Sequence, residues 1–117
     1  MNLKDRTNLL KDLCARIPYG VKCQCLGRIG TVRSIDTFGN TEVEGFSGSI
    51  VIDISHVRPY LFPMSSMTEE QKEDMIKSSC GIGSDKNVFD WYNKNHFDYR
   101  GLIHIGLGID ATNLNIY

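Results

Sequence analysis

The chain has 117 residues, 41% of them hydrophobic, and a formal net charge of -1. This length is typical of one domain with one buried core, and the apolar content excludes a disordered tail. No apolar run approaches the ~18 residues that span a bilayer, and no signal-peptide pattern opens the chain. We therefore expect a single soluble domain over residues 1–117, located in the cytoplasm and without contact to a membrane.

The first predicted element is an amphipathic helix over residues 3–16. Asn2 is placed to cap its start, and Pro18 and Gly20 are placed to end it. Four residues recur at the helical spacing i, i+3, i+4, i+7 and define its predicted buried face: Leu10, Leu13, Cys14 and Ile17.

Short strands follow over residues 19–57. Apolar and polar residues alternate there, as in half-buried strands, and glycine-containing clusters separate the alternating runs. We predict four strands, near residues 21–26, 29–36, 41–45 and 50–54. Their spacing predicts a meander curled into a small antiparallel SH3-like β-barrel of four or five strands.

The remainder of the chain is predicted to be a linker and a helical part. Pro59 and Pro63 remove backbone donors and disfavour helix in the residues before them, so residues 58–66 are expected to be extended. The helical part covers residues 67–110 and holds two or three helices. The predicted fold class is therefore α+β, with an N-terminal helix, the barrel and C-terminal helices.

Capping signals mark the C-terminal helices. Two overlapping capping boxes precede the first of them, Ser66-x-x-Glu69 and Thr68-x-x-Gln71. Gly81 is expected to end that helix, and Asn87 to cap a short second helix that ends near Asn95. Residues 102–109 fit both a strand and a helix, and Asp98 as a cap favours the helix.

The cysteines give no sign of a metal or a disulfide. They are Cys14, Cys23, Cys25 and Cys80. We interpret all four as reduced thiols in the core of a cytoplasmic protein, because a chain of this length folds without disulfides. Cys23-x-Cys25 lacks the C-x₂₋₄-C spacing of structural zinc sites, so we predict no metal and no cofactor.

No catalytic motif is recognisable either. A Ser-based triad would need a strained nucleophile elbow such as G-x-S-x-G, which the chain lacks. Cys80 lies near a predicted helix C-terminus, where the helix dipole opposes formation of a thiolate. We predict that the protein is not an enzyme, and an enzyme without a recognisable motif is the second alternative.

Nucleic acid is the alternative partner. Gly27-Arg28-Ile29-Gly30 matches the GXXG loop of KH domains, but strands flank it here, so we interpret it as a hairpin turn. Cations and an aromatic ring on a small barrel are suited to single-stranded nucleic acid. The candidate contacts are Arg28, Arg33, Arg58 and Tyr60. Because the net charge disfavours this partner, a weak single-stranded nucleic-acid-binding module ranks second.

Another protein is the favoured partner. Aromatic residues and arginine, which protein interfaces concentrate, gather near the C-terminal end. The candidate binding residues are Trp91, Tyr92, His96, Asp98, Tyr99 and Arg100. A structural role is the alternative, with His96 and Arg100 contacting the Asp98 carboxylate while that carboxylate caps the following segment. We predict a non-enzymatic binding or adaptor protein.

Two stretches resemble a known group of proteins. Residues 58–71 (RPYLFPMSSMTEEQ) and 90–103 (DWYNKNHFDYRGLI) are similar to signature stretches of short uncharacterised proteins of gut anaerobic bacteria and their phages. Residues 10–22 extend the resemblance loosely. The resemblance implies a prophage or mobile-element setting, in which small accessory proteins commonly bind other macromolecules.

Overall fold

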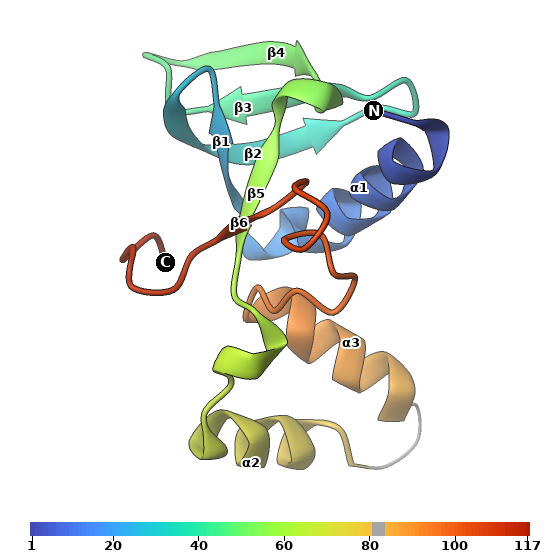
Figure 1. The fold of residues 1–117 in the computed structure, drawn as a ribbon, viewed down its shortest axis with the longest axis vertical. Helices are drawn as coiled ribbons and strands as arrows, with labels where there is room; N and C mark the ends of the chain where they lie inside the picture. The colour runs from blue at the N-terminus through green and yellow to red at the C-terminus, as the bar shows by residue number, and fades with distance from the viewer. Residues whose placement is uncertain (81–83) are drawn as a thin grey trace.

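The computed structural model describes residues 1–80 and 84–117, and it is α+β, as predicted. The helices and 3-10 helices are α1 Leu3–Arg16, η1 Ile17–Tyr19, η2 Ile54–His56, η3 Met64–Ser66, α2 Glu69–Ser78 and α3 Ser84–Lys94. The strands are β1 Lys22–Cys25, β2 Arg28–Ile35, β3 Asn40–Glu44, β4 Ser49–Asp53, β5 Arg58–Leu61 and β6 Ile109–Asp110. Within the two described ranges, no helix has the length and apolar character needed to cross a bilayer. The sheet and α1 lie at one end of the 39 Å long axis, and α2 and α3 lie at the other (Figure 1).

Helix α1 has its predicted bounds, and its buried face is rotated from the predicted one. The Asn2 side chain accepts a hydrogen bond from the backbone N–H of Asp5 at 2.8 Å, and Gly20 ends the helical run with a φ of 70°. The predicted face is wrong at Cys14, which is exposed, whereas Leu13 is buried and Leu10 and Ile17 are partly buried against the core. The buried residues are Leu9, Asp12, Leu13 and Arg16. The face is shifted because two charged residues of the helix pair with each other inside the protein.

The six strands form one mixed sheet in the order β4-β3-β2-β1-β5-β6. The four predicted strands are confirmed as β1 to β4, and they pair in sequence as antiparallel neighbours. β5 pairs antiparallel with β1 and parallel with β6. The pairing does not close this sheet into the predicted SH3-like barrel, because β5 runs away from β4 towards the helical end (Figure 1).

The hairpin between β1 and β2 contains the GXXG sequence. Cys25 pairs with Arg28 across it, and the two connecting residues, Leu26 and Gly27, have φ values of 52° and 73°. Two successive residues with positive φ are typical of the tight turns that match the twist of a hairpin. The interpretation of this motif as a hairpin turn is confirmed.

The main core lies between α1 and one face of the sheet. Leu9 and Leu13 of α1 are fully buried in it. The other buried members come from the sheet and its connections, with one from the C-terminal segment: Val21, Cys23, Cys25, Val32, Val43, Ile54, Val57, Leu61 and Leu102. Burial of each large aliphatic side chain contributes about 1.5–3 kcal/mol to folding.

The four cysteines are free, as predicted, but only two of them are core thiols. Cys23 and Cys25 are buried, whereas Cys14 and Cys80 are exposed. Burial raises the pKa of the Cys23 thiol to about 12, so this thiol is protonated at neutral pH. The prediction of a core position is therefore wrong for Cys14 and Cys80.

The predicted linker 58–66 is wrong over its first half, which forms β5. Pro59 lies opposite Cys23 of β1, and the residues that follow it in β5 are buried. Pro59 predicts a break in regular structure, but burial of Tyr60 and Leu61 outweighs the lost backbone donor. Beyond β5, the backbone N–H of Phe62 donates to the carbonyl of His96 at 2.8 Å, which ties the sheet to the helical end.

One of the two predicted capping boxes forms. The Thr68 side chain accepts from the Gln71 N–H at 3.1 Å, and the Gln71 side chain accepts from the Thr68 N–H at 2.8 Å. Ser66 instead donates its hydroxyl to the carbonyl of Pro63. The predicted helix end at Gly81 lies outside the described residues.

The second C-terminal helix starts earlier than predicted. It is α3, which begins at Ser84, so Asn87 lies inside the helix and is not its cap. It ends at Lys94, next to the predicted end at Asn95. Helix α3 therefore begins directly after residues 81–83, which the structure does not describe.

The predicted helix over residues 102–109 is wrong. The Leu107 and Gly108 N–H groups both donate to the carbonyl of Leu102, at 2.9 and 3.1 Å, which closes the segment into a loop. Gly106 has a φ of 80°, a conformation that interrupts helix and strand alike. Alternation of apolar residues becomes a strand only at Ile109, where β6 begins.

Candidate functional site

The predicted protein-binding residues come together, but mostly inside the molecule. Trp91, His96 and Asp98 are 6%, 6% and 7% exposed. Tyr92 and Tyr99 are half-buried, and their rings stack with centroids 5.6 Å apart. Arg100 is the only exposed member of the six. The cluster therefore has the burial of a small second core and offers little surface to a partner.

Trp91 joins the two C-terminal helices. Its indole stacks on the ring of Phe97 with centroids 5.5 Å apart and planes 13° from parallel. Its Nε1–H donates to the carboxylate of Asp74 in α2 at 2.8 Å. A buried tryptophan with its N–H satisfied is a packing residue. It holds α2 against α3, which is the main contact that α2 makes.

Asp98 caps the following segment as predicted, but the predicted contacts with its neighbours are wrong. Its carboxylate accepts from the backbone N–H groups of Leu102 and Ile103 at 2.8 and 3.0 Å. Neither His96 nor Arg100 donates to it. The Nε of Arg100 lies 3.4 Å from a different carboxylate, that of Asp12 in α1. Sequence proximity suggested a local cluster, whereas the fold pairs Arg100 with a residue far away in the chain.

A buried ion pair lies under this turn. Arg16 Nε donates to Asp12 at 2.9 Å, and both side chains have no exposed surface. Arg16 also donates to the carbonyls of Phe97 at 2.6 Å and Tyr92 at 3.4 Å. One guanidinium thus connects α1 to the end of α3 and to the turn after it. Such an arginine positions structural elements, because every donor contact that it makes is to the protein itself.

Sequence reasoning missed this pair, although a signal was present. Asp12 and Arg16 stand four residues apart, and with Leu9 and Leu13 they recur at i, i+3, i+4, i+7. Opposite charges at i and i+4 on a helix attract each other, which lets a mixed face be buried. Charged residues are rarely buried completely, so the apolar residues of the helix alone predict a face that leaves Asp12 and Arg16 exposed.

The ion pair shifts the pKa values of the groups around it. Burial raises the pKa of the Asp12 carboxyl in spite of the nearby Arg16. Burial, together with the charge of Arg16, lowers the pKa of His96 to about 4, so its imidazole is neutral at pH 7. That ring stacks on the Tyr117 ring with centroids 3.8 Å apart. The groups with shifted pKa values are thus packed against protein and do not line a cleft.

Two buried polar atoms of this region lack a hydrogen-bond partner among the described residues. They are Oδ1 of Asp12 and Nδ1 of His96. The 3.4 Å contact of Arg100 with Asp12 is an ion pair without hydrogen-bond geometry. Each such atom costs free energy, so the region is held together by the packing around it.

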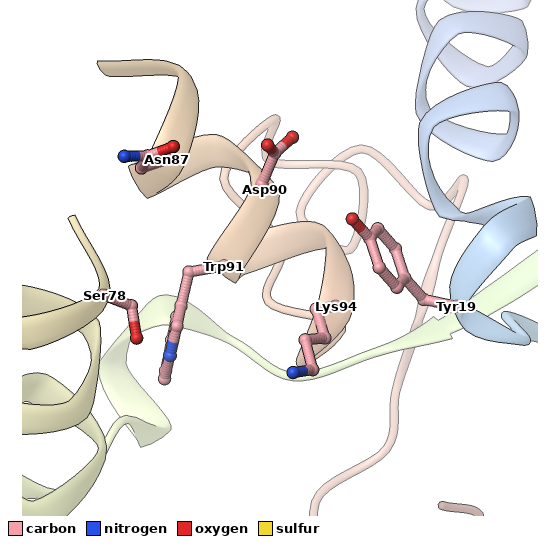
Figure 2. A pocket seen from close by; sticks show the side chains of 6 residues that line it. All are labelled: Tyr19, Ser78, Asn87, Asp90, Trp91 and Lys94. Carbon is pink, nitrogen blue, oxygen red and sulfur yellow. The ribbon is translucent and has the colours of Figure 1, made fainter. Parts of the chain in front are cut away.

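A shallow cleft adjoins Trp91 between α2, α3 and η1. Its volume is about 190 Å³, below the roughly 300–1,000 Å³ of ligand pockets. Figure 2 shows the Trp91 indole facing Ser78 of α2 on one side, with Lys94 and the Tyr19 ring on the other. The cleft is a junction between three elements and is smaller than the usual ligand pocket.

The candidate nucleic-acid contacts do not form one surface. Tyr60 is 5% exposed, so its ring cannot stack on a base. Arg33 is paired with Glu44 of the neighbouring strand, which neutralises its charge. Arg28 and Arg58 are exposed, and Arg58 lines a small hollow with His56. Among the described residues neither Arg28 nor Arg58 forms an ion pair, and these two arginines give a weaker cationic surface than the sequence suggested.

The outer edge of the sheet is the surface that sequence reasoning missed. β4 is the terminal strand of the sheet, and no strand in the described part of the chain covers its outer side. Its sequence is Ser-Ile-Val-Ile-Asp, and Val51 at its centre is 70% exposed. An apolar strand at an open edge is a template for pairing with another chain. Alternation in 50–54 revealed the strand but not its position in the sheet.

The chain matches no protein family, and neither a curated protein nor a solved structure is significantly similar to it. Among residues 1–80 and 84–117, no three His, Cys, Asp or Glu side chains gather as a ligand set for a metal ion. A function for this protein is therefore argued from its own surfaces.

Proposed function

We propose that this protein is a non-enzymatic binding module that recruits an extended segment of another polypeptide to the edge of β4. The observation that carries the proposal is the open edge itself, where an apolar β-branched strand ends the sheet with Val51 exposed. Addition of a strand at such an edge gives affinity through main-chain hydrogen bonds.

Features on both faces of β4 support this binding mode. Ile50 and Ile52 are half-buried on the core side, and Val51 lies on the outer side. An added strand would place its alternate side chains beside these residues, which provides selectivity for β-branched or aromatic residues. β4 spans the five residues Ser49–Asp53, so the segment that pairs with it is expected to be about five residues long.

The other surfaces support a partner less well. The Trp91 cleft is smaller than the usual ligand pocket, and the Trp91 residue that borders it is only 6% exposed. Single-stranded nucleic acid would have to bind through Arg28 and Arg58, because Tyr60 is 5% exposed and Arg33 is paired with Glu44. We therefore rank a protein partner first, and nucleic acid becomes one outcome of the tests.

The proposed setting is the cytoplasm, in a phage or another mobile element. The four free cysteines support a reducing compartment, because exposed thiols such as Cys14 and Cys80 persist there. The mobile-element setting rests on the resemblance of residues 58–71 and 90–103 alone.

The test is a selection of phage-displayed random peptides on the immobilised chain, with the Val51→Lys variant as the target for counter-selection. A lysine on an edge strand blocks pairing without entering the core. We expect enriched peptides with alternating apolar residues. Added as synthetic peptides, they should shift the backbone amide NMR signals of Ser49–Asp53 in the parent and in Val51→Thr, but not in Val51→Lys.

Two results would contradict the proposal. One is a failure to enrich peptides under conditions in which the chain is monomeric, or shifts that map to the Trp91 cleft in place of β4. The other is tight binding of labelled mixed-sequence single-stranded DNA or RNA in a fluorescence-polarisation titration. A steep loss of that binding with salt, and with Arg58→Ala, would identify a nucleic-acid-binding module instead.

A further inference from the structure

The hydrogen bonds at the two ends of the β3–β4 pair determine which backbone groups of β4 face outward. The Ile54 N–H donates to the Gly39 carbonyl at 2.8 Å, and the Gly45 N–H donates to the Gly48 carbonyl at 3.1 Å. Both bonds join residues that stand opposite each other in the register of β3 and β4. Bonded pairs alternate along an antiparallel ladder, so the bonded residues of β4 between these ends are Ile50 and Ile52.

The other residues of β4 therefore direct their N–H and C=O groups away from β3. These residues are Ser49, Val51 and Asp53. Their outward groups form a regular row with the spacing of a strand ladder, and the side chain of the central one, Val51, is 70% exposed. The edge is thus ready to accept one antiparallel strand.

β4 lacks the features that protect edge strands in other proteins. It contains no lysine, arginine or proline, and it pairs with β3 without a bulge. The opposite edge differs, because β6 is only two residues long and so offers little backbone for pairing. β4 therefore offers a longer and more regular edge than β6, and this asymmetry indicates a single specific pairing on one side of the sheet.

We propose that the strand recruited at this edge is β4 of a second copy of the chain, which makes one continuous sheet across a two-fold axis. This inference rests on the proposed function, since it names the partner of the same edge. In the antiparallel arrangement centred on Val51, the two Val51 residues face each other. Ser49 of each copy then lies opposite Asp53 of the other, where the hydroxyl can donate to the carboxylate. A two-fold pairing of this kind is closed and stops at two copies.

The side chains of β4 are complementary to themselves in this register. Ile50 of one copy lies opposite Ile52 of the other, and both are only half-buried in the single chain. Pairing would complete their burial, and β-branched pairs across strands stabilise a sheet. Because the Asp53 carboxylate is already held by Arg6 at 2.7 Å, no unpaired charge enters the contact. The net charge of -1 per chain adds little repulsion.

The first test measures molecular mass against protein concentration by sedimentation equilibrium, for the full chain and two variants. We expect the parent and Val51→Thr to move from one chain mass towards two as concentration rises. Val51→Lys should remain at one chain mass, because two lysines would stand opposite each other at the axis. A parent that stays at one chain mass, or a Val51→Lys variant that associates equally well, would overturn the inference.

The second test locates the contact by hydrogen exchange. The Val51 N–H faces solvent in the single chain and is expected to exchange more slowly as concentration rises, in step with the fraction of dimer. The amides of Ile50 and Ile52 are bonded to β3 at every concentration and serve as internal controls. If the parent stays monomeric while selected peptides still bind β4, the second-copy inference fails and the proposed function stands. If neither a second copy nor a peptide binds at β4, both fail.

Discussion

The segment Trp91–Arg100 and the strand β4 differ in how plainly the sequence marks them and in how open they are in the structure. The segment is dense in aromatic and charged residues, yet Trp91, His96 and Asp98 are almost fully buried. β4 is a short apolar run like those in the core of many sheets, yet Val51 is among the most exposed large side chains of the protein.

The difference shows that charged and aromatic residues suited to binding a partner can instead form ion pairs, hydrogen bonds and stacking contacts with one another inside the fold. Arg16 and Arg100 both approach Asp12, and the Asp98 carboxylate is used by two backbone N–H groups. What remains available to a partner is backbone at the open edge of the sheet. Substitutions in the Trp91–Arg100 segment and at the residues it contacts should therefore lower stability, and substitutions at the edge of β4 should not.

The largest effect is expected for Arg16→Ala. This change leaves the Asp12 carboxylate buried without its main partner and removes the hydrogen bonds to the carbonyls of Phe97 and Tyr92. Removal of one member of a buried ion pair costs about 3–5 kcal/mol, so the free energy of unfolding should fall by about that amount. Urea unfolding followed by circular dichroism measures it.

A double variant provides the control. Asp12→Leu with Arg16→Met replaces both charges by apolar side chains of similar size, and such replacements are often neutral or stabilising. We expect it to recover most of the stability that Arg16→Ala loses. If Arg16→Ala alone unfolds at the parent's urea midpoint, the ion pair does not hold α1 to the helical end.

The next effect is a dependence of stability on pH through His96. Its pKa is lowered to about 4 in the folded protein, whereas an unfolded histidine titrates near 6.5. Between these values the unfolded chain binds a proton that the folded chain does not. The contribution of neutral His96 to the free energy of unfolding is therefore fully present above pH ~6.5. It is lost as pH falls towards 4, and the loss is roughly 2–3 kcal/mol.

The control for this effect is His96→Asn. Asparagine tolerates the φ of 62° at this position and does not titrate, so the variant should lose less stability than the parent between pH 6.5 and 4. The raised pKa of Asp12 makes the folded state more stable as pH falls, which is opposite to the effect of His96. Because Asp12 is present in both proteins, its effect cancels when the pH profile of the variant is subtracted from that of the parent. Parallel pH profiles for parent and variant would show that His96 is accessible to protons in the folded state.

The sequence was a good guide to local structure and a poor one to long-range pairing. α1, the first four strands and the Thr68 capping box depend on residues close in sequence, and all of them are confirmed. The open sheet depends on β5 pairing with β1, a contact between residues such as Arg58 and Gln24 that no local pattern specifies. The proline signal at 58–66 also concealed β5, because burial decided its conformation.

The sequence predicted that the residues of the Trp91–Arg100 segment gather, but it predicted neither their structural role nor the open edge of β4. Asp98 caps the following segment, which its position before a turn indicated. The partner of Arg100 is Asp12, in a helix that no sequence pattern placed beside the turn. Exposure of β4 follows from its place in the strand order, which only the assembled sheet determines.

An intermediate effect is expected for Asp98→Ala. The carboxylate accepts two backbone hydrogen bonds, from Leu102 and Ile103, and both donors would lose their partner. We expect a loss of about 1–2 kcal/mol in the free energy of unfolding, with no direct effect on peptide binding at β4. Thermal denaturation beside Asp98→Asn, which keeps one acceptor oxygen, measures it. An unchanged melting temperature for Asp98→Ala would mean that water replaces the carboxylate at this turn.

The smallest effect is expected for Val51→Lys, which is why this variant separates binding from folding. The Val51 side chain is 70% exposed, and its N–H and C=O point away from β3, so the substitution removes little packing and no hydrogen bond within one chain. In dilute solution the free energy of unfolding should stay within about 0.5 kcal/mol of the parent value, as for other surface substitutions. Urea unfolding at low protein concentration gives this comparison, with Val51→Thr as the uncharged control. A loss above about 1 kcal/mol for Val51→Lys alone would mean that the valine contributes to packing within the single chain. The edge of β4 would then serve stability as the Trp91–Arg100 segment does, and the contrast between the two regions would not hold.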